Sequence, residues 1–140
     1  MGRINIGRLL LGGLVAGLVI FLIEGAMGPT YMAEWVRAMQ AHNLPMPSGA
    51  SSAVGGALLS LLMGVGLVFF YAAARPRFGA GVKTAVIVAV AYFVFAYLVG
   101  LIGYGLIGLY PTDLLVRWGV QGLVQLTLAA IAGAWLYREA

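Results

Sequence analysis

The chain has 140 residues, of which 63% are hydrophobic and only 9% are charged. A soluble domain is about half apolar and about a quarter charged, so this composition excludes an ordinary water-soluble fold and requires lipid as the solvent. The absence of cysteine excludes disulfides, thiolate metal sites and a cysteine nucleophile. The net charge of +4 comes from basic residues dispersed over segment ends, which argues against a nucleic-acid partner.

The first predicted element is a transmembrane helix at about residues 9–27, which follows a short basic start. A secretory signal peptide has the same beginning, but here Pro29 would lie directly after the cleavage site, where it is poorly tolerated. We therefore expect a membrane span. Gly13 and Gly17 form a GxxxG pair, which allows a neighbouring helix to approach closely.

A short interfacial helix is predicted next, at about residues 30–42. Pro29 should end the first helix, because proline interrupts the helical hydrogen-bond pattern. From Met32 onward, apolar residues then recur at positions i, i+3, i+4 and i+7, which is the pattern of an amphipathic helix. Trp35 would anchor this helix at the external membrane interface.

The second span is predicted at about residues 53–74, which contain no charged side chain and are long enough to cross a membrane. Small residues recur at every fourth position to form a stripe along one face of this helix: Ser52, Gly56, Ser60 and Gly64. Helices in lipid associate through close packing of such faces. We therefore expect this stripe to contact another helix.

The third span is predicted at about residues 84–109 and the fourth at about 114–137. The third is longer than a perpendicular crossing needs, and its glycine-rich part at 100–108 is the expected place for a kink or a close helix contact. Together these elements predict an all-α fold. It is a single transmembrane domain over residues 1–140, a bundle of four transmembrane helices plus the interfacial helix.

Basic residues fall unequally on the two sides of the four predicted spans. One side has Arg3, Arg8, Arg75, Arg77, Lys83 and Arg138, and the other has Arg37 and Arg117. Because Lys and Arg are retained in the cytoplasm, this distribution predicts cytoplasmic termini and an external interfacial helix. Arg75, Arg77 and Lys83, in the turn between the second and third spans, are the residues expected to set the topology.

Glu24 is the one acidic residue inside a predicted span, and an ionisable group at this depth is a functional candidate because it is costly to bury. The predicted depths bring four more polar side chains into the same outer half of the bundle: Ser60, Tyr104, Gln121 and Gln125. One interpretation is a titratable or ligand-binding site. The other is structural, with Glu24 hydrated or paired with Arg117 and the glutamines joining helices through hydrogen bonds.

Two short motifs resemble those of a family of small bacterial membrane proteins. RPRFG at residues 75–79 and GAWLYRE at residues 133–139 are similar to the turn after the second span and to the C-terminus of that family, which is uncharacterised. The resemblance implies four spans and a bacterial inner-membrane location. It carries no activity and no site residue over to this chain.

No set of residues suits catalysis or metal binding, so we expect no enzyme activity and no catalytic or metal-ligating residue. No cofactor is evident, although a bound lipid, quinone or pigment is compatible with the composition. The small-residue faces predict a non-catalytic accessory or scaffold subunit, which associates with itself or with other membrane protein subunits among membrane lipids. The alternative is a small carrier or channel for a lipid, quinone or proton-coupled solute, centred on Glu24.

Overall fold

The computed structural model describes residues 4–138, so Arg3 of the topology prediction and Glu139 of the C-terminal motif lie outside the described part. Four helical stretches are long and apolar enough to span a membrane, which confirms the predicted all-helical fold with four candidate spans. The elements in chain order are α1 (Ile6–Ala41), α2 (Gly49–Phe78), α3 (Val82–Tyr92), η1 (Phe93–Leu98), α4 (Val99–Leu106) and α5 (Thr112–Leu136).

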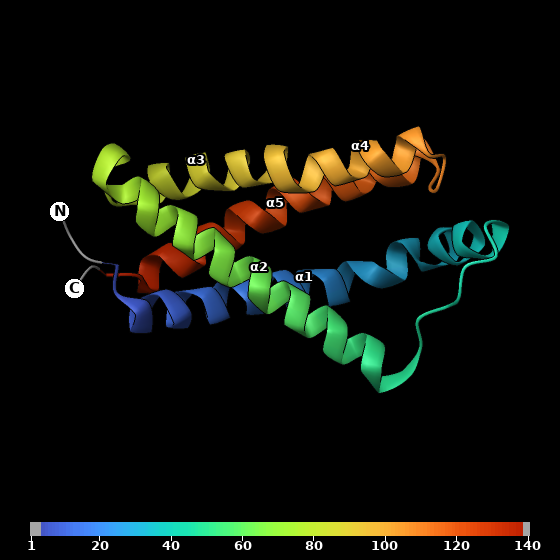
Figure 1. Cartoon of the computed structure of the whole chain (residues 1–140), viewed down its shortest axis with the longest axis horizontal. Coiled ribbons are helices and arrows are strands. Elements are labelled where there is room, and N and C mark those ends of the chain that lie inside the picture. Colours follow the sequence, from blue (N-terminus) through green and yellow to red (C-terminus); the bar gives the residue numbers. More distant parts are fainter. Residues whose placement is uncertain (1–3, 139–140) are drawn as a thin grey trace.

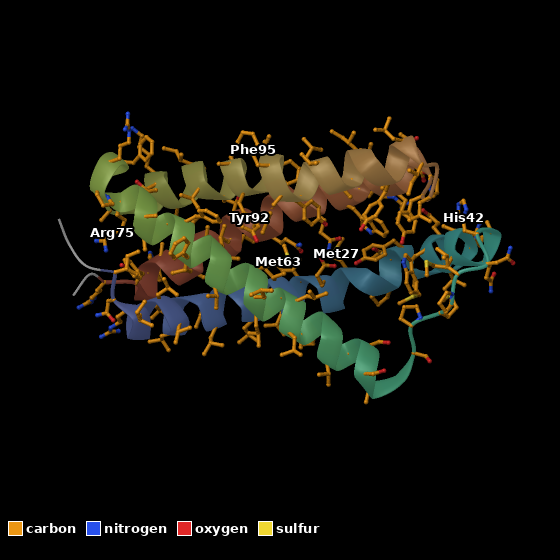
Figure 2. The ribbon with its side chains drawn as sticks, in the orientation of Figure 1. Met27, His42, Met63, Arg75, Tyr92 and Phe95 are labelled. Atoms are coloured by element: carbon orange, nitrogen blue, oxygen red, sulfur yellow. The ribbon has the colours of Figure 1, made fainter. Side chains whose placement is uncertain are left out.

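The helices α1, α2 and α5 form the centre of the bundle, and the third span lies along α5 (Figure 1). The basic turn between α2 and α3 and the end of α5 lie at one end. There the Arg75 guanidinium lies 5.3 Å from the ring centroid of Tyr137 and 5.9 Å from that of Tyr71. Figure 2 shows Arg75 at this end and His42 at the opposite end.

The structure has no separate interfacial helix, because α1 is one helix of 36 residues and the segment predicted at about 30–42 continues it. Proline is disfavoured inside a helix partly because its ring collides with the Cβ of the preceding residue. Here that residue is Gly28, which has no Cβ, so this clash is absent where α1 continues through Pro29. At about 1.5 Å per residue α1 is about 54 Å long, well beyond a hydrocarbon core about 30 Å thick.

The outer end of α1 is fastened to the turn between α4 and α5. The His42 ring nitrogen Nε2 lies 3.1 Å from the Gly108 carbonyl oxygen, within hydrogen-bonding distance. The Tyr110 hydroxyl donates to the Met39 sulfur at 3.8 Å. These contacts explain why the long end of α1 lies against the bundle.

The GxxxG pair of α1 meets the small-residue stripe of α2 in direct backbone contact. A Cβ atom added to Gly64 would lie 2.6 Å from the Gly17 Cα, and one added to Gly13 would lie 2.7 Å from the Val65 Cα. Real Cβ atoms do not approach so closely. The crossing of α1 and α2 therefore requires glycine on both helices.

The outer half of α2 diverges from the bundle, as the green helix in Figure 1 shows. A Cβ added to Gly56 would meet nothing within 4 Å, and Ser52 bonds only within its own helix, to the Ser48 carbonyl at 3.2 Å. The predicted stripe is thus divided. Ser60 and Gly64 are buried against α1, whereas Ser52 and Gly56 are not covered by another helix.

In the third span, the α-helical hydrogen-bond pattern is interrupted in the aromatic part and not in the glycine-rich part. Its middle element, η1, is a wider π-helical segment, a type that is rare and occurs frequently at functional sites. Gly100 and Gly103, in contrast, meet no neighbour within 4 Å. η1 places Tyr97 against α5, where a Cβ on Gly122 would lie 2.8 Å from the ring carbon Cζ.

Candidate functional site

Glu24 is the centre of a hydrogen-bonded group between α1 and α5. Its Oε2 accepts a hydrogen bond from the Tyr31 hydroxyl at 3.0 Å, and its Oε1 accepts one from the Gln125 amide Nε2 at 2.8 Å. Tyr31 lies two turns after Glu24 on the same face of α1. Both carboxylate oxygens therefore accept hydrogen bonds from neutral donors.

The two glutamines of the predicted cluster lie at this group. Gln125 is only 1% exposed, and its Oε1 accepts no hydrogen bond from the described residues. Gln121, one turn earlier on the same face of α5, interacts with the Tyr31 side chain. Glu24, Gln121 and Gln125 are thus brought together.

The other two members of the predicted cluster lie elsewhere. Among the described hydrogen bonds, none joins Ser60 or Tyr104 to Glu24. Ser60 is buried at the crossing of α1 and α2, where its carbonyl oxygen faces Gly17. The Tyr104 ring packs edge-on against Tyr110 with centroids 5.5 Å apart.

A cavity of about 320 Å³ opens beside Glu24. Its lining comes from α1, η1 and α5 and consists of Glu24, Gly28, Tyr31, Met32, Trp35, Tyr97 and Trp118. The Tyr31 and Trp118 rings meet edge-to-face, with centroids 5.6 Å apart and planes at 84°. The site therefore joins one carboxylate to an aromatic wall.

The sequence did not reveal Tyr31, Tyr97 and Trp118 as members of this site. The sequence pattern predicts Tyr31 in a separate interfacial helix, so its position two turns after Glu24 does not indicate that the two side chains meet. That spacing is a usable signal only if α1 is known to continue through Pro29. Tyr97 reaches the cavity from the π-helical segment, which no local pattern predicted.

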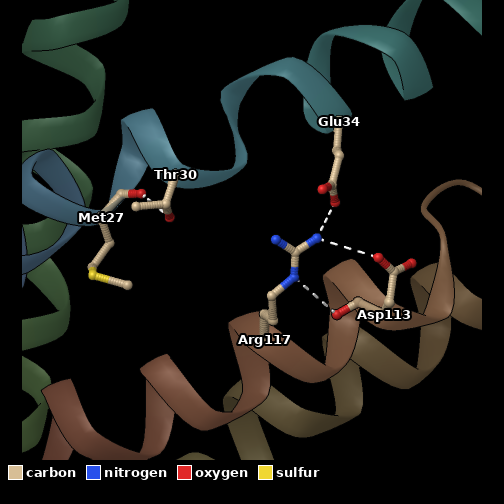
Figure 3. A network of polar contacts seen from close by, with 5 residues as sticks. All are labelled: Met27, Thr30, Glu34, Asp113 and Arg117. Carbon is tan, nitrogen blue, oxygen red and sulfur yellow. Dashed lines mark hydrogen bonds and ion pairs between the residues drawn. The ribbon is translucent and has the colours of Figure 1, made fainter.

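The proposed pairing of Glu24 with Arg117 is wrong, because the guanidinium of Arg117 is occupied by other acids (Figure 3). It forms ion pairs with Glu34 of α1 and with Asp113 of α5, the latter at 3.2 Å, and its Nε donates to the Asp113 carbonyl at 3.4 Å. In the part of the chain from residue 4 to 138, no cationic side chain pairs with Glu24. Among the described residues, the hydrogen-bond partners of Glu24 are therefore the neutral side chains of Tyr31 and Gln125.

A second, larger cavity of about 600 Å³ lies between α2 and α3. Its walls are almost wholly apolar and include Phe70, Phe78, Tyr92 and Phe95. Figure 2 shows Tyr92 turned into the bundle and Phe95 turned away from it. This cavity has no ionisable carboxylate or basic group, so it suits apolar chains and no polar chemistry.

The Glu24 site can bind and orient a solute, but a single carboxylate among neutral donors is poor acid–base machinery. Within residues 4–138, no group of three His, Cys, Asp or Glu side chains is placed to hold a metal ion. Comparisons with family models, with curated proteins and with solved structures found nothing that matches this chain.

Proposed function

We propose that this protein binds a small, partly apolar solute at Glu24 and carries it within or across the membrane. The observation that supports this proposal is the cavity of about 320 Å³ beside a carboxylate that has two neutral donors. Burying an ionisable group in lipid is costly, and such groups mark solute pathways. If Glu24 served only to join α1 to α5 through its hydrogen bond with Gln125, no cavity would be needed beside it.

The proposal includes a location in the bacterial inner membrane, with both termini in the cytoplasm. It is supported by the basic residues Arg75, Arg77 and Lys83 around the turn from α2 to α3. Residues 30–41 of α1 would then lie at the external interface, with Trp35 among the headgroups. Glu24 lies about 27 Å along α1 from Ile6, close to the external side of a core about 30 Å thick.

Glu24→Gln is expected to abolish solute retention and to preserve the fold, because glutamine keeps the shape of the side chain and loses its charge. The measurement is mass spectrometry of small molecules released by denaturing the purified protein, with helical content followed by circular dichroism. Glu34→Gln is the matched control, since Glu34 pairs with Arg117 outside the cavity. An identical set of retained molecules in wild type and Glu24→Gln would contradict the proposal.

A second candidate is the accessory or self-associating subunit, which the uncovered half of the stripe favours. Gly56 and Ser52 present a small-residue face that no helix of the bundle covers. Gly56→Leu is therefore expected to convert an oligomer to a monomer in mild detergent, as measured by light scattering. Gly100→Leu, also in open space but on α4, should leave the oligomer intact. A wild-type protein that is monomeric in several detergents would rule out self-association.

A further inference from the structure

The walls of the cavity beside Glu24 are built mainly of aromatic rings. Tyr31 and Trp35 come from α1, Tyr97 from η1 and Trp118 from α5. An aromatic ring has a negative face, and several rings around one space attract a cation more strongly than one ring does. The rings come from three elements that are far apart in sequence, so the fold itself assembles this wall.

The charged groups near the cavity also favour a cationic ligand. Glu24 has no cationic partner between residues 4 and 138, and Arg117 is held by Glu34 and Asp113. The buried Gln125 donates its amide Nε2 to Glu24 at 2.8 Å and brings no positive charge to the carboxylate. A cation in the cavity would therefore meet a carboxylate that no cationic side chain of residues 4–138 pairs with.

We infer, resting on the proposed function, that the cavity takes an organic cation whose nitrogen is fully alkylated, such as a trimethylammonium group. A primary ammonium carries three N–H donors that need acceptors, and Glu24 is the only carboxylate in the lining. A quaternary ammonium has no N–H group and spreads its charge over methyl groups that fit against aromatic rings. This chemistry is shared by free organic cations and by choline lipid headgroups.

The test compares benzyltrimethylammonium with neopentylbenzene, its uncharged carbon isostere, by titration calorimetry on the full chain in detergent. The chain has three tryptophans, and Trp135, which is 79% exposed, is the one outside the cavity. In a Trp135→Phe background, a change in tryptophan emission therefore reports on the cavity. We expect the cation to bind about tenfold or more tightly than the isostere, as several cation–π contacts and a carboxylate require.

Two substitutions, with Glu34→Gln as the control, separate the contribution of the Glu24 carboxylate from that of the aromatic rings. Glu24→Gln is expected to remove the preference for the cation, whereas Glu34→Gln should keep it. Tyr97→Leu, which leaves the charge in place, should weaken cation binding about threefold to tenfold through the loss of one ring. Displacement of the probe by vesicles of phosphatidylcholine, but not of phosphatidylglycerol, would identify a lipid headgroup as the source. No displacement by either would identify a free cation.

The outcomes also distinguish this inference from the proposed function. Equal affinity for the cation and its isostere, both lost in Glu24→Gln, would overturn the cation preference and leave solute binding in place. Absence of binding by either probe, together with no retained molecule in the purified protein, would overturn both. Cation binding that is unchanged in both Glu24→Gln and Tyr97→Leu would place the probe elsewhere and overturn the inference.

Discussion

Gly64→Ala is expected to lower the free energy of unfolding by about 2 kcal/mol or more. The new methyl group would lie 2.6 Å from the Cα of Gly17, so the backbones of α1 and α2 must separate at their crossing. Overpacking of this kind costs about 1–3 kcal/mol, and alanine returns up to about 1 kcal/mol in helix propensity. Because backbone atoms, and not a flexible side chain, receive the contact, we expect the upper part of this range. Thermal unfolding in detergent, followed by circular dichroism, measures the change.

Gly56→Ala is the matched control for this experiment. It lies two turns before Gly64 on the same face of α2, and its added methyl group meets nothing within 4 Å. In the monomer we expect unchanged or slightly increased stability, because alanine favours the helix. A loss of stability equal to that of Gly64→Ala would show that the outer half of α2 is packed, contrary to the structure.

Gly122→Ala is expected to disturb the candidate site as well as the fold. A Cβ at this position would lie 2.8 Å from Cζ of the Tyr97 ring, so the ring must move away from α5. We expect a loss of about 1–3 kcal/mol in stability and a fall in solute affinity, since Tyr97 lines the cavity. Unfolding and titration of the same sample measure both effects.

Gly119→Ala provides the comparison for Gly122→Ala. Gly119 lies three residues earlier on α5, and its added methyl group would lie 3.6 Å from a Leu101 methyl, an ordinary van der Waals distance. Stability and solute affinity should therefore stay close to those of the wild type. If both substitutions weakened binding equally, the cause would be the geometry of α5 and not the displacement of Tyr97.

The positions of the four spans could be predicted because apolar length is a strong signal in lipid. The contact of Gly17 with Gly64 also follows a local rule, since small residues four apart mark one close-packed face. The sequence predicts Gln125 in the same half of the bundle as Glu24, about one turn deeper, and a hydrogen bond joins the two side chains. Each of these features depends on periodicity or on position along a helix.

The remaining features depend on contacts and backbone geometry that form only in the assembled bundle. Arg117 has three acids within a plausible range of depth, and only the assembled bundle shows that Glu34 and Asp113 bind it. Proline in a sequence favours the end of a helix, yet α1 continues through Pro29 and α2 through Pro76. The widened turns of η1 have no local signature in the sequence, and they place Tyr97 against Gly122 of α5.

The helix α1 is continuous from Ile6 to Ala41. Glu24 sits partway along it, and Glu34 and His42 tether its far tip to the opposite hairpin. Since one continuous helix holds both Glu24 and this end, the contacts that fasten the end also fix the height of the carboxylate within the bundle.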